Sequence, residues 1–273
     1  MNMYYPPSVR TRTAPDLKDA NIGPGRFWWM DTVTLIAYPV LMVGGMFALA
    51  PVILRLSDAG VGLEALTFGA NAVVYLVLVI LVLIAAGKDL KRSMPGKGRF
   101  SPVHLLWIPV AWLGSIAISI GLAAAAGGVQ QSLNQESIQQ MTTAAPFWLM
   151  FIVVVLMGPL VEEYIFRHLL IGKVSRRFKI EWLMVAISAL AFASIHFISG
   201  GDLSFQALVP YLGQGIAIGI FYVLMRKSLF MAWLLHALNN FVALILLYAT
   251  QGMGLDTEVS VAWLGWAGVL LSL

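Results

Sequence analysis

Long uncharged apolar runs, separated by short polar segments, dominate the chain from about residue 28 onward. A transmembrane helix needs roughly 20 consecutive apolar residues. Seven runs meet or approach this length, and an eighth of 15 residues ends at the C-terminus. The pattern therefore predicts eight membrane-spanning helices, over residues 33–54, 65–87, 104–128, 146–172, 182–198, 207–225, 228–250 and 259–273.

The polar segments define the remaining organisation. Residues 1–27 contain four prolines and four basic residues and have no apolar core, so they are interpreted as a loose polar tail. Residues 28–273 form the membrane domain, and the Gln-, Asn- and Ser-rich segment 129–145 is predicted to be a loop. The fold class is thus an all-α polytopic membrane protein built as a bundle of eight transmembrane helices.

Composition agrees with this class. The chain is 60% hydrophobic and 11% charged, and its mean hydropathy is +0.85. A soluble domain carries about 25% charged residues, so the composition indicates an integral membrane protein. The sequence contains no cysteine, which excludes disulfides, thiolate nucleophiles and Cys-ligated metals.

The basic residues are distributed asymmetrically between the two sides of the predicted bundle. They gather in the N-terminal tail and in segments 88–99, 173–179 and 226–227, whereas the intervening loops 129–145, 199–206 and 251–258 contain no Lys or Arg. Cytoplasmic loops of membrane proteins are enriched in Lys and Arg. Both termini are therefore predicted to be cytoplasmic, in a multi-pass protein of the cell (plasma) membrane. The net charge of +4 then follows from topology and does not indicate a nucleic-acid partner.

Three charged residues lie inside the fourth predicted span: Glu162, Glu163 and Arg167. Each charge at a bilayer centre costs roughly 2.5–3.5 kcal/mol, and an unpaired trio about 8–10 kcal/mol. Such residues face a protein interior or a water-filled cavity, and they suggest a functional site. The alternative is a buried ion cluster that only ties helices together.

Two further spans each carry a histidine paired, at helical spacing, with a second residue of interest. Phe192 and His196 are separated by four residues in the fifth span, and so are His236 and Asn240 in the seventh. Residues at this spacing share one helix face. A single intramembrane histidine is more often structural than functional. Polar groups of catalytic type on three separate helices instead favour one shared site, in a cavity nearer the cytoplasmic side.

Taken in order, the motifs Glu162-Glu163-x-x-x-Arg167, Phe192-x-x-x-His196 and His236-x-x-x-Asn240 resemble those of the CAAX prenyl protease and bacteriocin-processing (CPBP, or Abi) family. The resemblance covers about residues 146–250, and the first 100 or so residues show no motif that can be mapped. It implies an eight-helix intramembrane glutamic endopeptidase with a cytoplasm-facing cavity. The implied substrates are membrane-associated peptides or proteins in the lipid bilayer, and no cofactor or metal is implied.

Amide hydrolysis needs an activated water, a stabilised oxyanion and a proton for the leaving amine. The resemblance assigns activation of the water to Glu162 and His196, whose side chains are suited to hold and deprotonate it. His236 and Asn240, one helical turn apart, can direct N–H donors at the oxyanion. No covalent acyl-enzyme is expected, because the spans offer no Ser/His/Asp or Cys/His set.

The two adjacent glutamates are predicted to have different roles. Glu163 and Arg167 are four residues apart with the acid first, which favours an ion pair on one helix face. Glu162 lies about 100° around the helix and is free to face the cavity. Pro159 has no N–H and disfavours a continuous helix through Gly158, so a kink there is expected to aim the following turn inward. Glu162 is therefore assigned to catalysis, whereas Glu163, Arg167 and Phe192 are assigned to supporting the site.

Two other functions remain open from the sequence. Glu162, His196 and His236 are also a possible zinc set with an open fourth position, as in a metalloprotease, although no His-Glu-x-x-His helix is present. The third interpretation is a non-catalytic membrane protein that binds a peptide or confers immunity.

Overall fold

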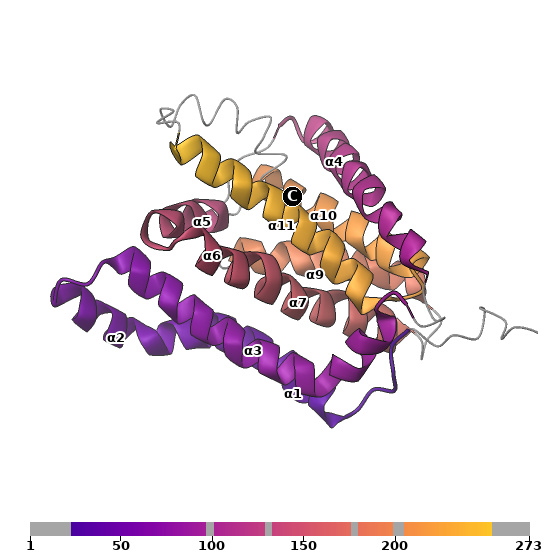
Figure 1. The fold of residues 1–273 in the computed structure, drawn as a ribbon, viewed down its shortest axis with the longest axis horizontal. Helices are drawn as coiled ribbons and strands as arrows, with labels where there is room; N and C mark the ends of the chain where they lie inside the picture. Colours follow the sequence, from indigo (N-terminus) through magenta and orange to yellow (C-terminus); the bar gives the residue numbers. More distant parts are fainter. Residues whose placement is uncertain (1–22, 97–100, 129–132, 176–179, 199–204, 253–273) are drawn as a thin grey trace, which may run out of the picture.

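The fold is given by a computed structural model, which describes residues 23–96, 101–128, 133–175, 180–198 and 205–252. Within these ranges every secondary-structure element is a helix (Figure 1). The elements in chain order are α1 (Trp29–Pro39), η2 (Val40–Gly45), α2 (Met46–Asp58), α3 (Leu63–Ser93), η3 (Pro102–Leu106), α4 (Trp107–Ala125), α5 (Leu133–Ala144), α6 (Phe147–Met150), η4 (Phe151–Met157), α7 (Gly158–Glu162), η5 (Glu163–Val174), α9 (Glu181–Ile198), α10 (Phe205–Leu224) and α11 (Leu229–Gly252).

In the described residues, six continuous helical segments are long and apolar enough to cross a membrane, which makes this a multi-pass membrane protein. They match six of the predicted spans and are Trp29–Asp58, Leu63–Ser93, Pro102–Ala125, Phe147–Val174, Phe205–Leu224 and Leu229–Thr250. The fifth predicted span appears as the shorter apolar helix α9, whose 18 residues extend about 27 Å. The eighth, 259–273, lies outside the described residues. The count of eight and the cytoplasmic termini therefore stay predictions.

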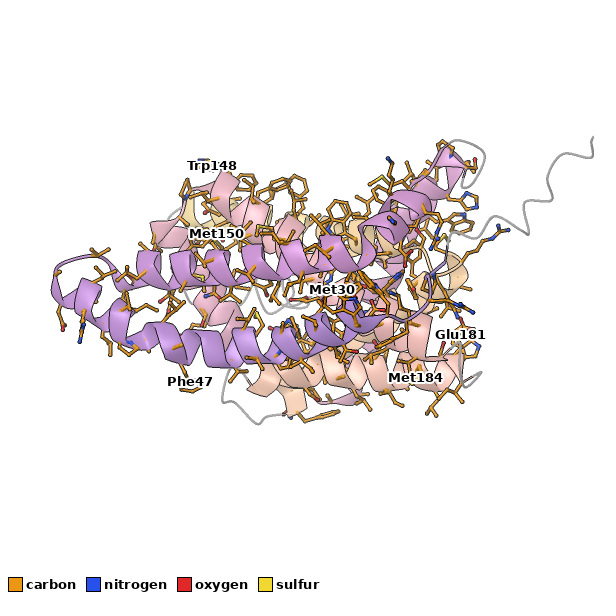
Figure 2. The ribbon with its side chains drawn as sticks, turned by 90° about the horizontal axis from the view of Figure 1, so that it is seen from below. Met30, Phe47, Trp148, Met150, Glu181 and Met184 are labelled. Carbon is orange, nitrogen blue, oxygen red and sulfur yellow. The ribbon has the colours of Figure 1, made fainter. Side chains whose placement is uncertain are left out.

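The outer surface of the bundle is apolar. Phe47 and Trp148 point away from the bundle (Figure 2) and are 77% and 60% exposed. Met150, two residues after Trp148, is completely buried. Large apolar side chains exposed in this way are expected where a helix contacts lipid chains instead of water.

The helices are arranged so that the fourth span lies near the middle of the bundle. The α1–α2 segment runs beside α3 on one side of the molecule, and α4 covers the opposite side against α10 and α11 (Figure 1). Helices α9 and α10 pack closely because Gly215 has no side chain: a Cβ there would lie 2.9 Å from the Cα of Ala189. This close approach brings the motifs of α9 and the backbone of α10 toward the same region.

Segment 129–145, predicted to be a loop, contains the helix α5 over Leu133–Ala144. The loop prediction was wrong for these twelve residues. The helix is polar but includes Gln, Glu, Met and Ala, all of which have high helix propensity. Polarity alone therefore did not distinguish a surface helix from a loop.

The fourth span is not a regular α-helix. The short α-helical segment α7 lies between two π-helical segments, η4 and η5, whose turns are wider than those of an α-helix. Pro159 lies in the first turn of α7 and provides no N–H for the carbonyl four residues earlier. A widened turn is one way for a helix to accommodate such a break, and π-helical turns are frequent at functional sites. π-Helical turns thus lie on both sides of the position where the kink was predicted, and the kink itself stays a prediction.

A buried ion pair ties α1 to η5 at one end of the bundle. Lys173 Nζ lies 2.7 and 2.9 Å from the two carboxylate oxygens of Asp31. The same carboxylate accepts hydrogen bonds from the Tyr164 hydroxyl at 2.6 Å and from the Trp28 backbone N–H at 2.8 Å. Asp31 is fully buried, and each of its oxygens is therefore partnered by a donor.

A second carboxylate, Asp89 on α3, lies in a similar network. It contacts His168 Nε2 at 2.9 Å and Arg92 Nη2 at 2.6 Å, and it accepts a hydrogen bond from the Gly25 backbone N–H at 2.8 Å. Residues 23–27 of the predicted loose tail therefore lie against α3, whereas residues 1–22 are outside the described ranges.

Candidate active site

The predicted pairing of Glu163 with Arg167 is confirmed. The Arg167 Nη1 nitrogen lies 3.0 Å from Glu163 Oε1, and both side chains are completely buried. The pair is an electrostatic contact without the alignment of a hydrogen bond. Arg167 Nη2 donates instead to the backbone carbonyl of Gly215 at 3.3 Å. Arg167 therefore joins η5 to α10 while neutralising Glu163.

His236 on α11 lies between the two glutamates. Its Nδ1 is 2.8 Å from Glu163 Oε1, and its Nε2 is 3.8 Å from Glu162 Oε2. An ionised Glu163 can only accept, so Nδ1 must donate to it. His236 Nε2 then carries a proton only when the ring is an imidazolium. The sequence predicted that His236 lies in the site, but not its contact with Glu163.

Glu162, at the end of α7, is in a different environment from Glu163. It is buried, with 6% of the residue exposed, and its Oε1 accepts a hydrogen bond from the Tyr75 hydroxyl at 3.3 Å. In the described residues, the carboxylate paired with Arg167 is that of Glu163, not Glu162. Tyr75 comes from α3 and was missed by the sequence analysis. The only feature of the sequence that could have indicated Tyr75 was its polar hydroxyl group inside an apolar span.

Phe192 connects the motifs of different helices. Its ring centre lies 4.5 Å from the guanidinium carbon of Arg167. Its ring is also 4.7 Å from that of His196 and 5.8 Å from that of His236, measured between centroids. An arginine over an aromatic face is attracted by the ring quadrupole. Phe192 therefore supports the charged residue of η5 and both histidines.

His196 is fixed in a defined orientation on α9. Its Nδ1 lies 2.9 Å from the Phe192 carbonyl oxygen, and its ring stacks on Tyr211 of α10 at 4.4 Å. Because Nδ1 must donate to the carbonyl, Nε2 of the neutral ring carries the lone pair that can accept a proton. Tyr211 is a second neighbour of the site that the sequence analysis missed.

Asn240 is one turn from His236, as predicted, but its amide contacts the backbone. Its Nδ2 donates to the carbonyl of Val154 in η4 at 2.9 Å. A carboxamide has two N–H donors, so this bond leaves a second donor on the same nitrogen. Asn240 therefore joins α11 to a π-helical turn and retains one N–H for a further acceptor.

The zinc alternative concerns Glu162, His196 and His236. Among the described residues, no group of three or more His, Asp or Glu side chains is arranged so that it could hold a metal ion. These three side chains are accordingly not placed as a ligand set. A metal-free mechanism remains a proposal that needs a chemical test.

Together, the fold and the site define a multi-pass, all-helical membrane protein with a buried glutamate–histidine–arginine cluster contributed by several helices. Residues 144–242 match the family described as Type II CAAX prenyl endopeptidase Rce1-like. This segment contains all the motif residues from Glu162 to Asn240, and it is the part of the chain that is similar to the CAAX prenyl protease and bacteriocin-processing family.

A curated relative extends the similarity beyond this segment. The chain is 24% identical over 237 residues to the membrane-embedded CAAX protease MroQ of Staphylococcus aureus (strain USA300), an alignment that covers 84% of this chain and 94% of that protein. No solved structure gave a significant match.

Proposed function

We propose that this protein is an intramembrane endopeptidase that hydrolyses a peptide bond of a membrane-associated protein or peptide. The nucleophile is a water activated by a glutamate, with neither a metal ion nor a covalent acyl-enzyme. The match of residues 144–242 to a family described as Type II CAAX prenyl endopeptidase Rce1-like supports the general activity. The relative named as a CAAX protease supports it as well.

Glu162 is assigned as the base because its environment differs from that of the adjacent Glu163. Glu163 lies between Arg167 and His236 and is fully buried, so its charge is already compensated. Glu162 instead accepts a hydrogen bond from the neutral Tyr75 hydroxyl. The contact of Glu162 with His236 Nε2 is longer, at 3.8 Å, than the contacts of Glu163 with Arg167 and His236 Nδ1, at 3.0 and 2.8 Å. The less tightly paired carboxylate is the better proton acceptor, and Glu162 is therefore suited to activate water.

The proposed reaction proceeds in two steps. Glu162, assisted by His196, takes a proton from water while the water oxygen bonds to the substrate carbonyl carbon. His236 and Asn240 donate hydrogen bonds to the resulting oxyanion, a role in which His236 must be protonated at Nε2. The proton taken from water then passes to the leaving nitrogen as the carbon–nitrogen bond breaks. These two reaction steps need no oxidant and no chemical group other than those of the protein, the substrate and water.

The substrate is expected to lie in or on the membrane, because Glu162, His236 and Asn240 belong to candidate membrane-spanning segments and His196 to a shorter apolar helix. We place the cavity nearer the cytoplasmic side of the cell membrane. The distribution of basic residues along the sequence supports this placement.

The experiment compares membranes from cells that contain the wild-type protein with membranes containing Glu162→Gln. New N-termini of membrane proteins are identified by mass spectrometry, and candidate peptides are then cleaved by the purified protein in nanodiscs. We expect wild-type cleavage and none with Glu162→Gln at equal folded yield. Identical peptide sets would overturn the proposed protease activity. If Glu162→Gln removes a cellular phenotype that involves no cleavage, the protein acts as a binding protein.

A chelator separates the glutamate mechanism from the zinc alternative. The purified protein is treated with 1,10-phenanthroline, dialysed, and assayed with and without added Zn²⁺. We expect an unchanged rate. A rate that is lost and then restored by Zn²⁺ would make the protein a metalloprotease.

A further inference from the structure

The helix α3 contributes a polar group to the site although it lies outside the segment 144–242 that matches the family. Its buried face includes Val74, Leu78 and Val82, which recur at helical spacing and pack in the core. Tyr75 lies next to this face, and its hydroxyl contacts Glu162, which is 87 residues further along the chain. From this geometry we infer that Tyr75 is a positioning residue that fixes the Glu162 carboxylate for the reaction. The inference rests on the proposed function.

The Tyr75 ring lies beside the first turn of α7. A Cβ built at Gly158 would be 3.7 Å from two ring carbons of Tyr75, an ordinary van der Waals contact, so the ring is a close neighbour of this turn. Gly158 is one helical turn before Glu162. The ring can therefore lie along α7, and its hydroxyl reaches the carboxylate one turn further on.

This contact orients one particular oxygen of Glu162. Tyr75 holds Oε1 at 3.3 Å, whereas Oε2 is the oxygen directed toward His236, 3.8 Å from Nε2. A glutamate side chain has several rotatable bonds, and fixing Oε1 limits the directions in which Oε2 can point. Oε2 is therefore the oxygen that we assign to the attacking water.

The chemical nature of the donor matters as much as its position. A phenol hydroxyl donates a hydrogen bond without adding a charge, whereas the arginine beside Glu163 neutralises its partner. Tyr75 can thus hold Glu162 in place and leave its negative charge available for proton transfer. The alternative is that the hydroxyl only satisfies a buried polar group, which would affect stability but not turnover.

The test is Tyr75→Phe, which removes one oxygen and keeps the ring. Cleavage of an identified peptide substrate is measured in nanodiscs, with kcat normalised to folded protein and with KM and Tm determined in parallel. We expect kcat to fall about tenfold, the kinetic equivalent of one neutral hydrogen bond. KM should change less than about twofold, because Tyr75 acts through Glu162 and not on the substrate.

The matched control is Tyr164→Phe. Tyr164 also donates a phenol hydrogen bond to a buried carboxylate, but that carboxylate is Asp31, away from the proposed chemistry. We expect a lower Tm and a kcat within about twofold of wild type, since only structural support is lost. A purely structural role for Tyr75 would give this same result in Tyr75→Phe.

The outcomes separate this inference from the proposed function. If Glu162→Gln is inactive while Tyr75→Phe keeps the wild-type kcat, or raises KM alone, the positioning role is wrong and the protease assignment stands. If wild type and Glu162→Gln are equally inactive, the protease assignment itself fails. Loss of kcat in Tyr75→Phe with an unchanged KM, and not in Tyr164→Phe, supports the inference.

Discussion

Arg167 and Phe192, on separate helices, face each other in the centre of the protein, with the guanidinium carbon 4.5 Å from the ring centre. The arginine is completely buried, and the phenylalanine is 1% exposed. Because Arg167 also pairs with Glu163, the aromatic ring supports the charge of a residue adjacent to the proposed base. The Phe192-x-x-x-His196 motif thus contributes an aromatic packing surface as well as a histidine.

Phe192→Leu is expected to destabilise the protein by about 1–2 kcal/mol, through loss of the cation–π contact and of ring packing. The measurement is the free energy of unfolding in detergent. Phe205→Leu is the control, because Phe205 is 58% exposed on the outer surface. Equal effects of the two substitutions would show that the contact with Arg167 contributes nothing.

Glu163→Gln is expected to reduce stability strongly, because it leaves Arg167 buried without its carboxylate and replaces the charged acceptor of His236 Nδ1 with a neutral amide oxygen. Breaking a buried ion pair from one side costs about 3–5 kcal/mol in strong cases. Adding Arg167→Met should recover part of that loss, and thermal unfolding of the four proteins in a double-mutant cycle measures the coupling. Strictly additive losses would mean that the pair is not energetically coupled.

Asn240→Ala is expected to lower kcat by about 10²-fold with little change in KM, as for a donor used mainly in the transition state. The structure adds a second effect, a small loss of stability, because the hydrogen bond to the Val154 carbonyl is also removed. Steady-state kinetics and Tm are measured on the same preparation. A lower Tm with an unchanged kcat would restrict Asn240 to joining α11 and η4.

The orientation in the membrane can be tested at the two ends of α3. The chain has no native cysteine, so single substitutions give unambiguous labelling. Asp58 precedes α3, Lys91 lies in its last turn, and both are exposed. We expect Asp58→Cys to react with an impermeant maleimide in intact cells, and Lys91→Cys to react only after permeabilisation. The reverse pattern would invert the predicted topology.

Contacts within one helix were the part of the site that the sequence predicted well. Glu163 and Arg167 are close because residues four apart share a face, and this relation survives in the π-helical segment η5. The same spacing places the rings of Phe192 and His196 4.7 Å apart. Such contacts depend on the local backbone, which the residue pattern largely determines.

Contacts between helices could not be derived in this way. Tyr75 is 87 residues from Glu162, and His236 is 73 residues from Glu163. Hydrophobic periodicity shows which face of a helix is buried, but not which helix it meets or in what register. The segment containing Tyr75 carried no recognisable motif either, so its contact with the site appears only in three dimensions.

The widened turns of the fourth span were also beyond the sequence pattern. Pro159 indicated an irregularity, but an apolar segment looks the same whether its turns are α- or π-helical. The segment 129–145 shows the opposite difficulty, because a polar surface helix resembles a loop in a hydropathy profile. Backbone geometry in both cases depends on tertiary packing as well as on local propensity.

The ion pair between Asp31 and Lys173 has a consequence for biosynthesis. The two residues are separated by 142 positions, so the ribosome adds Asp31 to the growing chain long before it adds Lys173. Until Lys173 emerges, Asp31 lacks the cation that pairs with it in the folded protein, so docking of α1 in its final place is disfavoured. We therefore expect Thr34→Cys, at a position buried in the full chain, to react with a thiol reagent in a nascent chain stopped before Lys173. Protection of that cysteine in the shorter chain would show instead that the first helix docks early, and that the later helices assemble against it.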